Sequence, residues 1–512
     1  MRDHTRASGA AVGFVLALVI AFGAVGHGAD GPAALVDAAK AKDHQKLRAL
    51  LAQRADVKSR SADGSTALLW AAHWNDVASA GLLIRAGADP NAANDFRMTP
   101  LSLACTNGSG ALVDMLLNAG ADPNLAVGTG ETPLMTCASS GQAAAVRMLL
   151  ARGAKVDAKE PSQHQTALMW AAAERHPDVV RVLIEARADM TAHTKKGFTA
   201  LHFAAREGDV ESAKVLLAAG VNINSRSVAE PPADPPVTGG PRGQAYQATL
   251  SAGSTPLLVA TVRSQVPMAL YLLEQGADPN ATDAGFAPLH WASGTWEGGV
   301  SNPSYGFSDP MSGIPNRQAK LQLVRALLAR GANPNLRMTK RPPGFVGGYE
   351  DAAGATAFLM ASAAADVEMM QILLAAGADP TLVTDTKATA VMAASGLNRL
   401  IGESAITEAQ ALETVRLLIS LGLDGRGATT YGENALFGAG YRGWNTLLAL
   451  LIEKGADVNA VSKAGVTPWL AASGFGDRLG GVLYNTEGAD LLVKHGADPK
   501  LGRPCQAQNK CR

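Results

Sequence analysis

The sequence predicts an all-α repeat solenoid of about twelve stacked helix–turn–helix units with finger loops and five insertions. A Thr-(Pro/Ala)-Leu start recurs along the chain, and its copies at Thr66, Thr99 and Thr132 are spaced 33 residues apart. A segment resembling Leu-Leu-x-x-Gly-Ala-Asp-Pro-Asn follows most starts, as in the copy that ends at Asn91. The chain of 512 residues is 47% hydrophobic with a formal net charge of zero, which excludes a disordered protein.

Charge and cysteine content exclude two further classes. The 45 Lys and Arg residues balance 45 Asp and Glu residues, so no overall positive field attracts nucleic acid, and we expect no nucleic-acid partner. Four cysteines in the whole chain exclude a disulfide-dense scaffold.

Residues 1–29 have the pattern of a signal peptide. Arg2 and Arg6 precede an uncharged apolar run over 9–25, and small residues follow. The run is short for a membrane span, which needs about 20 apolar residues, although an uncleaved N-terminal anchor remains an alternative. We therefore expect a secreted or periplasmic protein with no membrane span after signal removal.

Each repeat encodes two helices and a turn. Thr is a good N-cap, and Pro fits the first helical position because its missing N–H has no partner there. A second amphipathic helix ends at Gly, which accepts the left-handed conformation, and Asp-Pro-Asn makes the following turn. One unit cannot bury its apolar face alone, so the units must stack. Arg187 replaces the usual Gly, so we expect slight strain at that helix end.

The repeat pattern divides the chain into segments. The polar 30–64 reads as an N-terminal capping repeat, 65–225 as regular repeats, 226–254 as a Pro/Gly-rich insertion, 255–501 as repeats with insertions, and 502–512 as a polar tail. The five insertions all lie after residue 220. Three interrupt the units that begin at Ala287, Thr389 and Thr467, and two lengthen the fingers that follow Gly220 and Gly331.

The period, the TPLHxA-like starts and the LLxxGADPN-like ends resemble the ankyrin repeat over roughly 35–501. The resemblance implies a scaffold that binds an unidentified protein without catalysis or cofactor, and we expect a monomer. From this resemblance together with the signal-like residues 1–29, we expect a secreted or periplasmic ankyrin-repeat protein of exported bacterial type. One alternative is an accessory protein that stabilises a periplasmic enzyme such as a catalase. Another is an enzyme with its active site in the 296–316 insertion, which no motif predicts.

Aromatic residues are the candidate partner contacts. They make up only 5% of the chain, yet several fall in the insertions after residue 291. Exposed aromatics in loops often mark contact surfaces. The candidates are Trp70, Trp170, Trp291, Trp296, Tyr305, Phe307, Phe345 and Tyr349. The alternative is that the tryptophans pack between repeats and that the loop aromatics fold back as local plugs.

The sequence predicts neither catalytic nor metal-binding residues. His202 and His290 match the start histidine of the ankyrin repeat, which implies a local structural hydrogen bond, and no HExxH or His/Cys metal spacing occurs. Residues 438–443 formally match G-x-G-x-x-G, but they fall on a first helix rather than after a strand, so we interpret the match as accidental.

The cysteines form two pairs in sequence. Cys105 and Cys137 fall on the first helices of consecutive repeats. Helix axes about 10 Å apart would keep their Cα atoms beyond the ~7 Å limit for a disulfide, so we expect two buried, unbonded cysteines. Cys505 and Cys511 lie in the polar tail, where a local disulfide and free thiols are both open.

Overall fold

The computed structural model describes residues 33–228, 252–294, 314, 316–340, 353–397, 406–474 and 484–502. Over these residues the regular secondary structure is helical, apart from one isolated β-bridge between Arg60 and Thr66. Twelve helix pairs follow one another in the described ranges. The predicted all-α repeat solenoid is confirmed. Each of the five predicted insertions includes residues outside the described ranges.

Each pair consists of a first and a second helix. The first helices are α1 (Ala34–Lys40), α3 (Ala67–His73), α5 (Pro100–Thr106), α7 (Pro133–Ser139), α9 (Ala167–Ala173), α11 (Ala200–Glu207), α13 (Pro256–Val262), α15 (Pro288–Ser293), α17 (Ala357–Ala363), α19 (Ala390–Ala394), α21 (Ala435–Arg442) and α23 (Pro468–Ala472). The second helices are α2 (His44–Ala52), α4 (Val77–Arg85), α6 (Gly110–Asn118), α8 (Ala143–Ala151), α10 (Pro177–Glu185), α12 (Val210–Ala218), α14 (Val266–Glu274), α16 (Arg317–Ala329), α18 (Val367–Ala375), α20 (Glu408–Ser420), α22 (Asn445–Glu453) and α24 (Thr486–Lys494).

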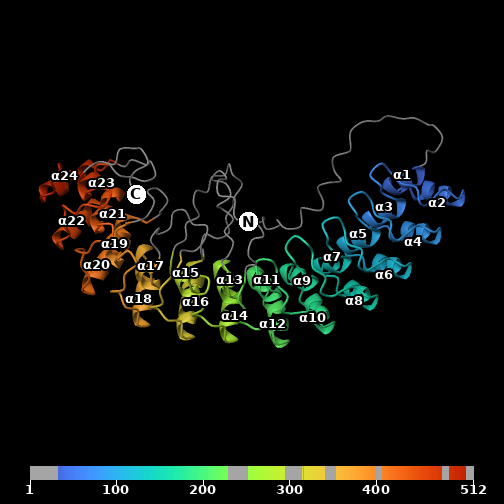
Figure 1. The fold of residues 1–512 in the computed structure, drawn as a ribbon, viewed down its shortest axis with the longest axis horizontal. Coiled ribbons are helices and arrows are strands. Elements are labelled where there is room, and N and C mark those ends of the chain that lie inside the picture. Colours follow the sequence, from blue (N-terminus) through green and yellow to red (C-terminus); the bar gives the residue numbers. More distant parts are fainter. Residues whose placement is uncertain are drawn as a thin grey trace. The chain divides into compact units, whose positions relative to one another are not determined.

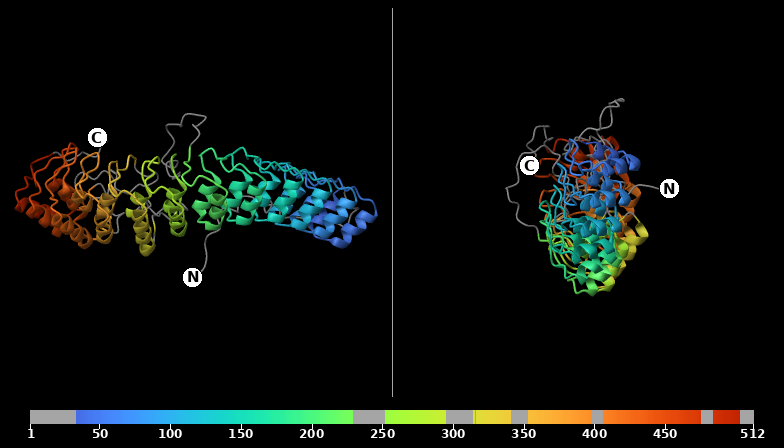
Figure 2. Two further views of the ribbon diagram at one scale, coloured as in Figure 1. Left: turned by 90° about the horizontal axis from the view of Figure 1, so that it is seen from below. Right: turned by 90° about the vertical axis from the view of Figure 1, so that its right-hand side faces the viewer.

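The chain divides into two compact units, Met1–Pro100 and Leu101–Arg512. In the first unit, α1 packs on α3 and α2 on α4. In the second, the first helices pack in order from α7 to α23, and the second helices make a parallel row in which α8 lies between α6 and α10 (Figure 1). The segment from the end of a second helix to the next start is called a finger. Fingers of the second unit lie along one side of its helices (Figure 2).

The predicted capping residues begin the helices. Thr66, Thr255 and Thr356 have extended backbone, and each side chain accepts a hydrogen bond from the N–H three residues later. Pro133 and Pro256 occupy the first helical position, where no N–H is needed. The sequence pattern therefore locates these helix starts correctly.

The second helices end in the left-handed conformation, as predicted. Gly153 and Gly220 have φ of 84° and 90° at this position. Arg187 takes the same role with φ of 63°, which costs a residue with a Cβ about 1–2 kcal/mol. The predicted strain at this helix end is confirmed.

His202 and His290 are buried links between neighbouring pairs. In each, Nδ1 accepts a hydrogen bond from a helix-start N–H, that of Thr199 or Ala287. The Nε2–H then donates to a carbonyl of the following finger, Ser254 at 3.0 Å or Leu336 at 2.8 Å. Burial lowers the pKa of both imidazoles to about 4, so both are neutral in the folded protein. The predicted structural role is confirmed.

Cys105 and Cys137 form a disulfide, so the prediction of two unbonded cysteines is wrong. Their Cα atoms are 4.5 Å apart, and both residues are fully buried. The prediction took the distance between helix axes, whereas residues on facing sides of two helices lie much closer than the axes do. The neighbouring Ala104 and Ala138 are also fully buried, and such small side chains allow close approach. Cys505 and Cys511 lie outside the described residues.

Candidate partner-binding groove

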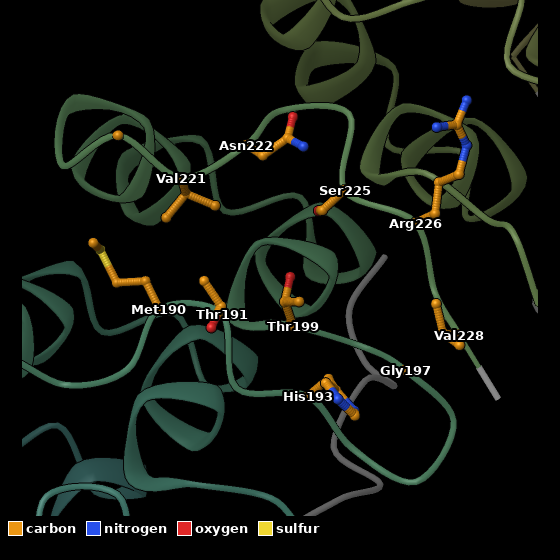
Figure 3. Close-up of a pocket in the computed structure, with 11 residues that line it drawn as sticks. Met190, Thr191, His193, Gly197, Thr199, Val221, Asn222, Ser225, Arg226 and Val228 are labelled. Atoms are coloured by element: carbon orange, nitrogen blue, oxygen red, sulfur yellow. The ribbon is translucent and has the colours of Figure 1, made fainter. Parts of the chain in front are cut away.

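A groove of about 500 Å³ separates two consecutive fingers of the unit Leu101–Arg512 (Figure 3). We call it the finger groove. Its lining residues are Met190, Thr191, His193, Gly197, Thr199, Gly220, Val221, Asn222, Ser225, Arg226 and Val228. Met190 and Val221 lie toward one end of it, and His193 and Val228 toward the other. None of these residues is acidic, so the groove combines apolar, hydroxyl and basic side chains.

Both fingers depart from the repeat pattern at the groove. Met190 and Thr191 stand where Pro279 and Asn280 stand in a regular finger. Val221 replaces the Ala that follows Gly in most units. Sequence reasoning compared the starts and the glycines, so it missed these residues. The signal that could have found them is the run of substitutions in the turn.

The Asn at the end of a regular turn joins neighbouring fingers. The Asn124 Nδ2 donates to the Gly153 carbonyl at 3.0 Å, and its Oδ1 accepts from the Lys155 N–H at 2.8 Å. The same pair of bonds recurs at Asn280, Asn335 and Asn459. We call this pair the Asn clamp. It holds together the bases of two consecutive fingers.

Thr191 makes no such clamp. Its hydroxyl donates to Asp189 Oδ1 at 2.6 Å, and its N–H donates to the same oxygen at 2.8 Å, so the polar groups turn back onto their own finger. Within the described part of the chain, the Gly220 carbonyl and the Asn222 N–H have no hydrogen-bond partner. Both residues line the groove. We call the place where the bases of two consecutive fingers meet a junction. The finger groove therefore opens at a junction where the Asn clamp is missing.

The two fingers meet near Gly197 and Val228. Gly197 has φ of 76°, and a Cβ at this position would lie only 1.9 Å from the Val228 backbone nitrogen. The close approach therefore requires glycine. Val228 itself is 66% exposed, which places an apolar side chain at the groove edge.

The carboxylates near the groove are already bonded to residues that line it. Asp189 accepts from Thr191, and this hydrogen bond is the main cause that lowers the pKa of its carboxyl. Asp283 accepts from Arg226 Nε at 2.6 Å. In contrast, the Ser225 hydroxyl oxygen is buried without a hydrogen-bond partner. The groove therefore offers unused polar groups but no free carboxylate among its lining residues.

The predicted aromatic contacts are placed differently. Trp70 and Trp291 are 7% and 1% exposed, and Trp170 is half-buried. Burial of Trp70 and Trp291 agrees with the packing alternative, while a partner contact at these positions stays a prediction. The other candidates lie outside the described residues: Trp296, Tyr305, Phe307, Phe345 and Tyr349.

Sequence reasoning also missed Trp74, in the unit Met1–Pro100. This side chain is 39% exposed, and its ring centroid lies 4.5 Å from that of His73. The Lys42 ammonium lies 4.1 Å from the centroid of the Trp74 ring. The predicted Trp70, Trp170 and Trp291 each lie four residues after a start, whereas Trp74 lies eight residues after Thr66.

No group of three or more His, Cys, Asp or Glu side chains among the described residues could hold a metal ion. None of the helices in the described ranges has the length and apolar character needed to cross a bilayer.

Family models match much of the N-terminal half. The model of ankyrin repeats in three copies matches residues 35–127, 80–160 and 158–227, and the model of the single ankyrin repeat matches 252–284. The chain contains ankyrin repeats. Ankyrin repeats imply a scaffold for protein–protein interaction.

Two similar proteins illustrate the extent of the likeness. Protein PhlB of Serratia liquefaciens is 31% identical over 129 residues, which cover 25% of this chain and 47% of PhlB, so the match spans about half the length of that relative. The crystal structure of the human ASB11 ankyrin repeat domain is similar at 27% identity and a TM-score of 0.39, over 48% of this chain and 98% of that domain.

Proposed function

We propose that this ankyrin-repeat protein is an exported, non-catalytic scaffold that binds a protein partner in the finger groove. The observation that carries the location is the missing Asn clamp at Thr191, because it leaves a cleft with unused backbone groups between two fingers. Other junctions, such as Asn124–Gly153, are closed by the chain itself. The clamp is also absent at Thr381, and the finger groove is the unclamped junction at which we place the partner because a cavity of about 500 Å³ lies there.

The chemistry of the groove suits an extended protein segment. Met190, Val221 and Val228 offer apolar contact, and the last of these is well exposed. Free backbone groups at Gly220 and Asn222 offer hydrogen bonds to a polar side chain or main chain. This combination of apolar lining and a few placed polar groups is typical of ligand sites.

Export to the periplasm or the exterior is the second part of the proposal. The basic, apolar and small-residue order of 1–29 supports it. The Cys105–Cys137 disulfide supports it independently, because disulfides persist in oxidising compartments.

Site-specific cross-linking tests the groove. A photo-reactive amino acid replaces Val221 in the full chain, and a matched control replaces Leu423, which also follows the Gly that ends a second helix. We expect an adduct with one partner protein from position 221 and none from 423. Met190→Ala should lower the yield of the adduct from position 221, whereas Val156→Ala, at the equivalent position of another finger, should not. Equal adducts from both probe positions, or none from 221, would overturn the groove as the site.

A reporter fusion tests export. Residues 1–29 are joined to alkaline phosphatase that lacks its own signal, since this enzyme needs disulfides formed outside the cytosol. Phosphatase activity in a bacterial host supports export, and Arg2→Glu with Arg6→Glu should reduce it. An inactive fusion protein that stays in the cytosol contradicts the proposal.

A further inference from the structure

We infer that the finger groove binds the side-chain carboxamide of an asparagine carried by an extended segment of the protein partner. The inference rests on the proposed function and specifies the chemistry that the partner presents. It follows from the four junctions at which the chain supplies that carboxamide itself.

The Asn clamps show how this fold binds a carboxamide. At Asn280, Nδ2 donates to the Gly331 carbonyl at 2.8 Å, and Oδ1 accepts from the Asn333 N–H at 2.7 Å. At Asn459 the corresponding distances to Gly496 and Asp498 are 2.9 and 2.8 Å. In every clamp the two backbone groups belong to a Gly and to the residue two positions later.

Gly220 and Asn222 have the same relation in sequence, at the same position of the repeat. Gly220 ends its second helix with φ of 90°, close to the 85° of Gly331 and the 94° of Gly496. In the described structure, the Gly220 carbonyl accepts no hydrogen bond and the Asn222 N–H donates none. One acceptor and one donor thus face a groove at the place that a carboxamide occupies elsewhere.

The neighbouring junction shows why other side chains fit less well. Asp157 stands in the place of the clamp Asn, and its Oδ1 accepts from the Asp189 N–H at 2.8 Å. A carboxylate has no N–H to donate, so it cannot bond the carbonyl of Arg187 as an Asn would. The single hydroxyl of Thr191 is already used by Asp189. A carboxamide holds a donor and an acceptor on one carbon, which matches both groups at once.

The lining sets what surrounds the asparagine. Met190 precedes Thr191 in sequence, Val221 lies between Gly220 and Asn222, and both line the groove. Apolar residues that flank the partner's asparagine therefore gain contact with these two side chains. No lining residue carries a carboxylate, so none of them can supply the acceptor that the Asn222 N–H lacks.

Fluorescence polarisation with labelled peptides tests the inference on the full chain. The probe is Ser-Ala-Leu-Asn-Leu-Ala-Ser, and the comparison peptides carry Asp or Ala in place of Asn. We expect the Asn peptide to bind about tenfold more tightly, which is the gain from two modest hydrogen bonds. Equal binding of the three peptides would overturn the inference.

Variants at Thr191 provide the second arm. Thr191→Asn should close the groove with an internal clamp, raise the thermal midpoint and weaken binding of the Asn peptide at least tenfold. Thr191→Ser should retain binding. Thr381→Asn is the matched control, because Thr381 also donates to its own finger, at Asp379 Oδ1. The junction of Thr381 with Gly422 and Asp424 also lacks a clamp in the described structure, so this variant closes a second junction of the same chemistry. Peptide binding that survives Thr381→Asn and is lost in Thr191→Asn supports the finger groove, whereas the reverse result, or a Thr191→Asn variant that binds like the parent protein, would contradict it.

Hydrogen exchange gives a readout that does not depend on any variant. Saturating Asn peptide should slow exchange of the Asn222 amide in the parent protein, because that N–H becomes a donor. Unchanged exchange at Asn222 overturns the inference. If cross-linking from position 221 still captures a partner in that case, the scaffold proposal stands and the carboxamide chemistry alone fails. If both fail, the groove is not the binding site.

Discussion

At the residue scale, the buried histidines make stability depend on pH. Burial lowers the pKa of His202 and His290 from 6.5 to about 4, so the folded state resists a proton that the unfolded chain accepts. The stabilisation is present above about pH 6.5 and is lost as the pH falls toward 4, by up to about 3 kcal/mol for each imidazole. Urea unfolding at several pH values should show this loss. His202→Gln should remove about half of this loss and leave the part that belongs to His290, and an unaltered profile contradicts the assignment.

Arg187 is a second position at which one residue carries a measurable cost. Its φ of 63° lies in the region that glycine occupies at the equivalent ends of other second helices. Arg187→Gly should raise the free energy of unfolding by about 0.5–1 kcal/mol, since relief of strain exceeds the entropy gained by the unfolded chain. Thermal denaturation measures the shift. A lower midpoint would show that the arginine side chain contributes contacts that outweigh its backbone strain.

At the scale of elements, glycine is required for different physical reasons at the tip and at the base of a finger. Gly153, at a base, has positive φ with open space around it, whereas Gly197, at a tip, faces the Val228 backbone. Gly153→Ala should cost about 1–2 kcal/mol from backbone strain alone. Gly197→Ala should cost clearly more, because strain and steric conflict add. Equal shifts in the thermal midpoint would show that the fingers separate without cost.

The helices and their caps could be predicted because each depends on a few residues in sequence. Thr66 caps its own helix, and Pro133 begins one, without help from distant residues. The Cys105–Cys137 bond could not be predicted in this way, because it depends on how closely two facing helices approach. The groove was also missed, because Asn was interpreted as a turn former alone, and its bonds to the next finger appear only in the stack.

At the scale of the whole molecule, repeat stacks are stabilised mainly by contacts between neighbours. The Cys105–Cys137 disulfide links two consecutive first helices, and its cysteines are 32 positions apart in sequence. Such a crosslink contributes about 3–4 kcal/mol in the chain-entropy model. Reducing agent should therefore lower the thermal midpoint of the parent protein.

Cysteine variants separate this disulfide from the tail. Cys137→Ala should melt at a lower temperature and lose its response to reducing agent, whereas Cys505→Ala should keep the parent response. Peptide mapping without reduction should find Cys105 joined to Cys137. A midpoint insensitive to reduction would show that packing between the helices suffices.

The Asn clamp also has an evolutionary consequence. A junction is sealed or left open by one side chain, and codons for asparagine and threonine differ at a single nucleotide. Because each clamp acts only on its neighbour, such a change does not alter the rest of the stack. Selection could therefore relocate a recognition site from repeat to repeat by point mutation, while the architecture stays the same.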